Sequence, residues 1–194
     1  MARTTSDQGH PRQRMVLGAA ELIGRNGVAA TSFGAVLEHS GAPRGSIYHH
    51  FPEGKSQLVV EAVEFAGDAL YQRLESVSGS MVDIIAGIGD IWRILLVAND
   101  YEWSCPVLAA GTARTVEPAA ADVAGATFVR WRDLIARRLT DEGIDAVRAP
   151  ALANLMIASI EGAVGMCRST RSIEPLDQVV AELQLLAGTL TSST

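Results

Sequence analysis

Apolar residues recur every three or four positions along nearly the whole chain, which is the spacing of helices that bury one face. No segment shows the alternation of apolar and polar residues that is typical of a half-buried strand. Proline, glycine and small polar residues separate the periodic segments and supply helix start and stop signals. The sequence therefore predicts an all-α protein with about nine helices, at residues 11–26, 32–40, 44–50, 54–75 and 81–96, a short one beginning near residue 106, and longer ones at 118–143, 150–167 and 175–190.

The chain has 194 residues, of which 48% are hydrophobic, and this is enough to fill a real core. Its composition changes after the serine- and glycine-containing stretch at residues 76–80. We expect three parts: a small module of short helices at 1–54, a connecting helix at 55–78, and a larger helical body at 79–194.

The most apolar stretch, residues 155–167, contains Glu161 and is shorter than the eighteen or so residues that a membrane span needs. The first residues carry positive charges with no apolar segment after them, so they do not resemble a secretory signal. The two cysteines, Cys105 and Cys167, form neither a metal-binding spacing nor a disulfide framework. We expect a soluble cytoplasmic protein that does not enter a membrane.

The net charge of −6 and the pI of about 5.2 argue against a nucleic-acid-binding protein. The charge, however, is distributed unevenly along the chain. Residues 1–58 hold six basic and four acidic residues, a charge of +2, together with all four histidines. The remaining residues hold ten basic and eighteen acidic residues, a charge of −8. This asymmetry fits a small anion-binding module on an acidic body, but an excess of two charges can also arise by chance.

Residues 31–55 carry the most informative pattern, TSFGAVLEHSGAPRGSIYHHFPEGK. Two short helices, the first with Thr31 as its expected N-cap, are joined by a tight turn at residues 41–43, and this is the spacing of a helix-turn-helix. In that motif the second helix enters the major groove of DNA. Here the second helix is rich in hydrogen-bonding side chains, while Ile47 and Phe51 lie four residues apart and can anchor it to the protein.

The segment GAPRGSIYHHF at residues 41–51 resembles the DNA-binding domain of TetR-family transcriptional regulators nearly residue for residue. The proline, glycine, lysine and leucine that follow, and the Ser-Cys-Pro-Val segment at 104–107, are similar to the LmrA/YxaF-like branch of that family. The resemblance implies a DNA-contacting set in which Thr31 caps a helix against phosphate, Arg44, Gly45 and His49 reach base edges or nearby phosphates, Tyr48, His50 and Lys55 hold the DNA backbone, and Ser46 does either.

The same resemblance implies a homodimer that binds an inverted-repeat operator in double-stranded DNA. The family builds its dimer contact from the last two helices. Small residues in the first of these permit close helix approach, and the second has an apolar stripe that needs a partner. The candidate dimer residues are Ala158, Gly162, Gly165, Val179, Leu183, Leu186 and Leu190; the alternative is that both helices are merely core.

Large apolar side chains in the central body point to a pocket for a small apolar or aromatic effector, although each of them alone is more often a core residue. The candidate ligand-binding residues are Trp92, Leu96, Trp103, Phe128, Trp131, Met156 and Glu161. Glu161 lies in an otherwise apolar helix, where it can bond a ligand, pair with an arginine or reach the surface.

The sequence contains no catalytic triad, phosphate-binding loop, paired catalytic carboxylates or metal-ligand cluster, so we expect no enzymatic activity, no metal and no cofactor. The leading hypothesis is a ligand-responsive DNA-binding regulator, and repression is the default because it is the commoner mode in the family. Two alternatives stay open. In the first, the protein is an activator of transcription. In the second, it is a helical small-molecule-binding protein of the same fold that does not regulate transcription through DNA.

Overall fold

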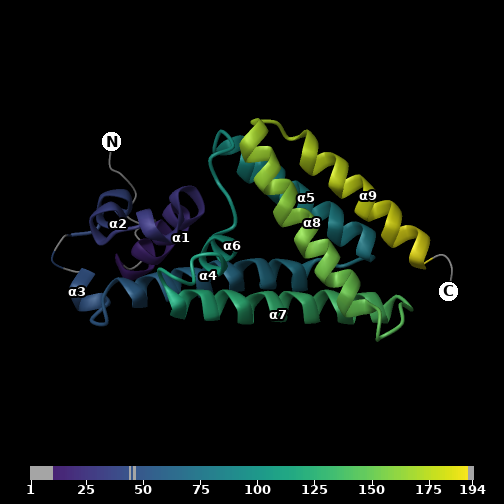
Figure 1. The fold of residues 1–194 in the computed structure, drawn as a ribbon, viewed down its shortest axis with the longest axis horizontal. Coiled ribbons are helices and arrows are strands. Elements are labelled where there is room, and N and C mark those ends of the chain that lie inside the picture. Colours follow the sequence, from purple (N-terminus) through teal and green to yellow (C-terminus); the bar gives the residue numbers. More distant parts are fainter. Residues whose placement is uncertain (1–10, 44, 46, 192–194) are drawn as a thin grey trace, which may run out of the picture. The chain divides into compact units, whose positions relative to one another are not determined.

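The computed structural model describes residues 11–43, 45 and 47–191, and every regular element among them is a helix (Figure 1). The predicted all-α class and the nine helices are confirmed for this described part. The helices are α1 Pro11–Ala30, α2 Phe33–Ser40, α3 Ile47–His50, α4 Lys55–Ser76, α5 Met81–Ala98, α6 Pro106–Gly111, α7 Pro118–Asp141, α8 Ala149–Thr170 and α9 Glu174–Thr191.

The chain folds into two compact units, and neither is a single stretch of sequence. The first comprises residues 1–67 and 106–124, and the second comprises residues 68–105 and 125–194. Helices α4 and α7 each contribute residues to both units. This division differs from the three consecutive parts expected from composition, because α6 packs against α1 across a long sequence separation.

Helix α1 is broken near its end by Gly27, whose φ of 77° lies in the left-handed region that glycine adopts without strain. The sequence predicted a stop here, and the helical path resumes only for the short stretch to Ala30. The predicted apolar face of α1 is buried and includes Val16 and Ile23. It packs against α2 and α6, and buried residues of α3 and α4 such as Ile47 and Leu58 also belong to the core of this unit.

The start of α2 differs from the prediction by one residue. The N-cap is Ser32, whose Oγ accepts a hydrogen bond from the Ala35 N–H at 3.2 Å. Thr31 is only 1% exposed, and its hydroxyl donates to the Gly27 carbonyl at 2.9 Å. The prediction that Thr31 caps this helix is therefore wrong, because its side chain closes the break in α1 instead.

In the second unit, α9 packs closely against α5 and α8. At the contact between α5 and α9, a Cβ atom added to Gly89 would lie 2.8 Å from Val180 Cγ2, so only glycine allows this approach. Helix α5 begins with a capping box in which Ser80 and Asp83 bond each other's backbone N–H groups. These contacts fix α5, which supplies much of the apolar wall described below.

Helix α8 is long and apolar enough to cross a membrane by length and composition, with a mean hydropathy of 1.3 over eighteen residues. Within this structure, 39% of that window is buried by the rest of the chain. A helix that packs against other helices can pass the same test, and α8 contacts α5 and α9.

Candidate nucleic-acid interface and ligand cavity

Helix α3 is oriented by two apolar side chains, Ile47 and Phe51, which are both fully buried. The guanidinium of Arg12 lies over the Phe51 ring at 5.3 Å from its centroid and forms an ion pair with Glu61 at 2.6 Å. These contacts hold one face of α3 against the other helices of the first unit. The other face is thereby turned to solvent, as the helix-turn-helix interpretation requires.

Tyr48 is the most exposed large side chain of this segment, with 70% of its surface accessible. Its ring meets the Phe33 ring edge to face, with 5.5 Å between centroids, so it is oriented although it is not covered. His49 is also exposed, and His50 is half-buried. A Cβ atom built on the exposed Gly45 would meet none of the other described residues within 4 Å.

Lys55, the only lysine of the chain, already has an internal partner. Its Nζ atom donates to the carbonyl of Val28 at 3.0 Å and thereby ties the start of α4 to the end of α1. An ammonium group has three donors, so this bond leaves capacity for a phosphate. Its DNA contact stays a prediction.

Two of the predicted DNA contacts, Arg44 and Ser46, lie outside the described residues. Thr31 is buried and cannot present its hydroxyl to phosphate. The neighbouring Ser32 is exposed at the first turn of α2, where backbone N–H groups also point outward. Ser32 was missed because the two adjacent hydroxyl residues give the same cap signal in sequence.

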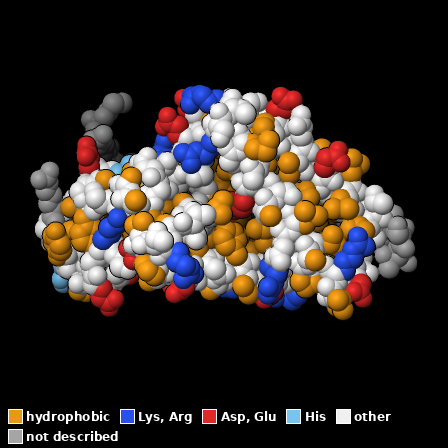
Figure 2. All heavy atoms as spheres, in the orientation of Figure 1, with side chains coloured by type: hydrophobic (Ala, Val, Ile, Leu, Met, Phe, Trp, Pro, Cys, Tyr) orange, Lys and Arg blue, Asp and Glu red, His pale blue; other side chains and the backbone are white. Residues whose placement is uncertain are grey.

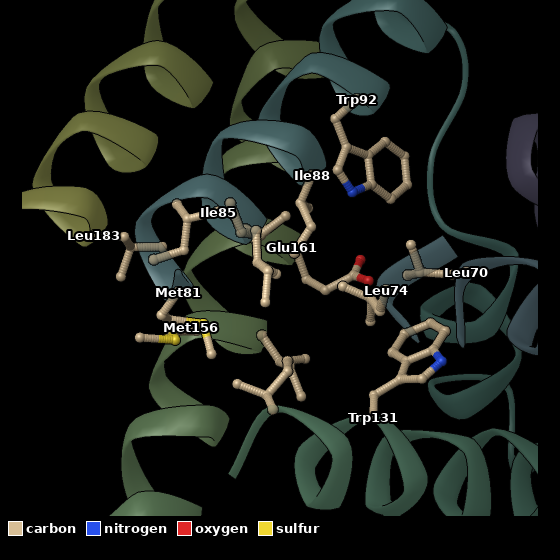
Figure 3. Close-up of a pocket in the computed structure, with 14 residues that line it drawn as sticks. Leu70, Leu74, Met81, Ile85, Ile88, Trp92, Trp131, Met156, Glu161 and Leu183 are labelled. Carbon is tan, nitrogen blue, oxygen red and sulfur yellow. The ribbon is translucent and has the colours of Figure 1, made fainter. Parts of the chain in front are cut away.

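An apolar cavity lies in the second unit among side chains from α4, α5, α7, α8 and α9 (Figure 3). It leaves about 530 Å³ of space between atoms when the solvent-open mouth is included, and about 40 Å³ of this can be reached by the centre of a water molecule, which is room for a few waters. Its lining consists of Leu70, Leu74, Met81, Ile84, Ile85, Ile88, Trp92, Trp131, Ile135, Met156, Ile157, Ile160, Glu161 and Leu183.

Glu161 is the polar member of that lining and is 8% exposed. Figure 3 shows its carboxyl group directed into the cavity between the indole rings of Trp92 and Trp131. Burial raises the pKa of Glu161 to about 7, while a hydrogen bond with the Cys105 side chain acts in the opposite direction. Within the described part of the chain, its Oε2 atom is buried and has no hydrogen-bond partner.

The structure brings four of the predicted ligand residues together at this cavity: Trp92, Trp131, Met156 and Glu161. The other three are near neighbours or core residues. Trp103 packs beside Trp92 with 6.0 Å between ring centroids, Phe128 meets Trp131 edge to face at 5.3 Å, and Leu96 is fully buried. They support the cavity wall but are not part of its lining.

Helix α4 supplies one wall of the cavity. Leu70 and Leu74 are four residues apart and line it, whereas Phe65 and Ala69 on the same helix are exposed. Neither leucine was among the predicted ligand-binding residues, because their four-residue spacing marks them as an apolar pair but not as cavity residues.

The Ser-Cys-Pro segment before α6 is joined to α8 by polar contacts. Arg168 donates to Ser104 Oγ at 2.9 Å, and Cys105, which is 3% exposed, bonds the carboxyl of Glu161. Sequence reasoning singled out this segment only by its resemblance. In the structure, it supplies the one described polar contact to the cavity carboxyl.

The outward face of α8 is uncharged and made of small or apolar residues. Ala158, Gly162 and Gly165 are exposed, and Leu155 and Met166 beside them are 47% and 57% exposed. Figure 2 shows hydrophobic side chains at the surface where Figure 1 draws α8. A Cβ atom added to Gly162 or Gly165 would meet nothing within 4 Å among the residues that the structure describes.

The predicted dimer residues of α9 divide into two groups. Val179, Leu186 and Leu190 are partly exposed. Leu183 is only 5% exposed and lines the cavity, so in this chain it is a core residue. The exposed Leu185, which was not among the predicted residues, is 65% accessible.

Two family descriptions match the sequence. Residues 16–62 match "Bacterial regulatory proteins, tetR family", and residues 82–182 match "Transcriptional regulator LmrA/YxaF-like, C-terminal domain". The two matched regions contain the helix-turn-helix and most of the cavity lining, respectively.

Curated relatives are similar over nearly their full length. An uncharacterized HTH-type transcriptional regulator of Mycobacterium tuberculosis strain H37Rv is 40% identical over 182 residues, covering 91% of this chain and 93% of the relative. The HTH-type transcriptional regulator LmrA of Bacillus subtilis is 28% identical, covering 87% of this chain and 92% of the relative.

Solved structures are similar in fold. A TetR transcriptional regulator from Chloroflexus aurantiacus superposes with a TM-score of 0.72 at 26% identity, covering 90% of this chain and 92% of the other. The regulatory protein TetR from Rhodobacter sphaeroides gives a TM-score of 0.80 at 15% identity, covering 90% of this chain and 97% of the other, a likeness of fold alone.

Proposed function

This chain belongs to the TetR family of bacterial transcriptional regulators, in its LmrA/YxaF-like branch, and is therefore a DNA-binding regulator. We propose that it represses its target genes until a small lipophilic effector releases it from DNA. The observation that carries the ligand-responsive part of this proposal is the apolar cavity that contains Glu161, whose Oε2 atom has no hydrogen-bond partner among the described residues. A regulator that acts on chromosomal DNA works in the cytoplasm.

The DNA-reading surface consists of α3 and the residues around it. The exposed Tyr48, His49 and Gly45 support this assignment. Arg44 is the proposed reader of a base edge or phosphate, with Ser46, His50 and Lys55 at the DNA backbone. Ser32 takes the phosphate position first predicted for Thr31.

The operator-binding form is a homodimer. A module with a charge of +2 neutralises few phosphates, and DNA affinity rises steeply with the number neutralised. Two copies double these contacts and read an inverted repeat. The uncharged outward face of α8, centred on Gly162, and the partly exposed side chains of α9 are the proposed contact.

Helix α4 is the proposed link between effector and DNA. Its first residue, Lys55, bonds the end of α1, and its later residues Leu70 and Leu74 line the cavity. A ligand that displaces these two leucines would shift α4 and change the distance between the two recognition helices of the dimer. Operator DNA requires a fixed half-site separation, so such a shift favours release.

The test is a gel-shift titration of the full chain on the DNA upstream of its own gene, repeated with a panel of lipophilic compounds. Linkage requires that a compound which weakens operator binding also binds more weakly when operator is present, by the same factor. We expect at least one such compound. A compound that binds equally well with and without operator is not an inducer, and failure to bind any upstream fragment would favour the DNA-independent alternative.

A further inference from the structure

We propose that the cavity binds a small lipophilic amine in its protonated form, with Glu161 as the counter-ion and the rings of Trp92 and Trp131 beside the charge. This inference names the chemical class of the effector and rests on the proposed function only for the consequence of binding. The binding itself depends on the cavity alone.

The first argument is the unpartnered carboxyl oxygen. A buried polar atom without a hydrogen bond is costly, so it is rare unless an additional group completes the site. Oε2 of Glu161 is such an atom among the described residues, and its carboxyl points into the cavity (Figure 3). The Cys105 side chain bonds the same carboxyl and leaves this oxygen for a ligand.

The second argument is the charge that a ligand bound beside Glu161 should carry. Every other residue of the described lining is apolar, so the cavity itself supplies no cation for Glu161. A protonated amine supplies both a donor and a positive charge, and charge-assisted hydrogen bonds are stronger than neutral ones. A carboxylate ligand would instead be repelled by the ionised form of Glu161.

The third argument is the aromatic pair. The indole rings of Trp92 and Trp131 lie on either side of the carboxyl (Figure 3). Tryptophan is the best aromatic partner for a cation, and the interaction is strongest where water is excluded. The isoleucine and leucine walls then contact the hydrocarbon part of the amine.

Only about 40 Å³ of the cavity can be reached by the centre of a water molecule, and this indicates a small occupant. The probes are therefore three compounds with one ring and different charges: cyclohexylamine, cyclohexanol and cyclohexanecarboxylate. Binding to the full chain without DNA is followed by calorimetry and by the fluorescence of the cavity tryptophans. We expect cyclohexylamine to bind about tenfold or more tightly than cyclohexanol, and cyclohexanecarboxylate to bind most weakly.

The matched variants are Glu161→Gln and Glu182→Gln, which remove the same charge inside the cavity and on the exposed side of α9. Glu161→Gln should weaken cyclohexylamine binding about tenfold or more and leave cyclohexanol within about threefold of the parent. Glu182→Gln should change neither. Equal affinity of the parent for the amine and the alcohol, or binding of none of the three probes, would overturn the inference.

Failure of this inference and failure of the proposed function give different results. If cyclohexylamine binds as expected but leaves operator affinity unchanged, the amine site stands and effector control through this cavity fails. If a neutral lipophile releases the operator and the amine does not bind, the regulatory proposal stands and the amine site is wrong.

Discussion

Tyr48 and Glu161 differ sharply in exposure, and both are polar residues in the two surfaces proposed to bind partners. Tyr48 is 70% exposed on α3, and Glu161 is 8% exposed in the cavity of the second unit. Tyr48 lies at the surface, where water can bond its hydroxyl at little cost. The Glu161 carboxyl has lost water and retains one unpartnered oxygen, and that arrangement is costly unless a ligand completes it.

This difference shows that the two sites are recognised in different ways, one from a sequence motif and the other from its physical surroundings. An exposed DNA-reading residue is energetically ordinary, and only its place in a motif reveals it. A buried carboxyl among isoleucine, leucine and tryptophan side chains is energetically unusual, and its surroundings reveal it without any motif. Four experiments test this contrast, in order of decreasing expected effect.

The largest effect concerns the pH dependence of stability. The pKa of Glu161 is raised to about 7 in the folded protein from 4.5, so the folded state holds a proton that the unfolded chain releases between these values. Stability should therefore fall as pH rises from 4.5 to 7 and then level off. The described groups around this carboxyl are the apolar cavity lining and the titratable Cys105.

Glu161→Gln should remove that loss. Between pH 5 and pH 8, the free energy of unfolding of the variant should rise by about 2–3 kcal/mol relative to that of the parent, as measured by urea unfolding at one protein concentration. Glu182→Gln, which changes an exposed carboxylate, is the control and should show no such gain. A parent and a Glu161→Gln variant with parallel pH profiles would mean that the carboxyl is not desolvated.

Arg44→Ala should weaken operator binding by about 1–3 kcal/mol if this side chain reads a base edge. The matched control is Arg137→Ala, which removes an exposed arginine from α7 and should leave DNA affinity unchanged. Both are measured by gel shift at one salt concentration, because phosphate contacts depend on salt. Parental affinity in Arg44→Ala would remove α3 from the DNA interface.

Gly162→Leu should weaken the dimer by about 1–3 kcal/mol, because a leucine would overpack a close helix contact. A Cβ atom at this position meets nothing within 4 Å in the described part of one chain, so the fold itself should tolerate the change. Gly125→Leu has the same open surroundings on α7 and serves as the control. Sedimentation measures both, and a parent that is monomeric at micromolar concentration would contradict the dimer proposal.

Tyr48→Phe should have the smallest effect, about 0.5–1.5 kcal/mol in operator binding, because only one exposed hydroxyl is lost and the ring contact with Phe33 stays. Tyr71→Phe, in which the ring keeps its contact with Arg130, is the matched control in the same gel-shift assay. A loss larger than that of Arg44→Ala would reverse the assigned roles of the two residues.

Helix positions were predictable because periodicity and stop signals are local properties of the sequence. The break at Gly27 and the start of α6 at Pro106 both followed from such signals. The cap of α2 was placed one residue early, because Thr31 and Ser32 give the same signal until the Gly27 carbonyl is seen to bind the threonine hydroxyl. That bond depends on the backbone conformation at Gly27, which the sequence pattern does not specify.

The cavity was predictable only in part. Large aromatic residues marked Trp92 and Trp131, but aliphatic residues such as Leu70 and Ile88 also line it, and nothing distinguishes them from other core positions in sequence. The contact of Cys105 with Glu161 joins residues far apart in the chain. Such pairings follow from tertiary packing, which periodicity does not describe.

The discontinuity of the first unit has a consequence for synthesis of the protein on the ribosome. Residues 1–67 leave the ribosome first, but the unit also needs residues 106–124, including α6, which covers α1. At about 5–20 residues per second, those residues follow roughly 3–11 s later. During that interval the nascent helix-turn-helix has an uncovered apolar face on α1, and binding of chaperones to the growing chain should be strongest in that window.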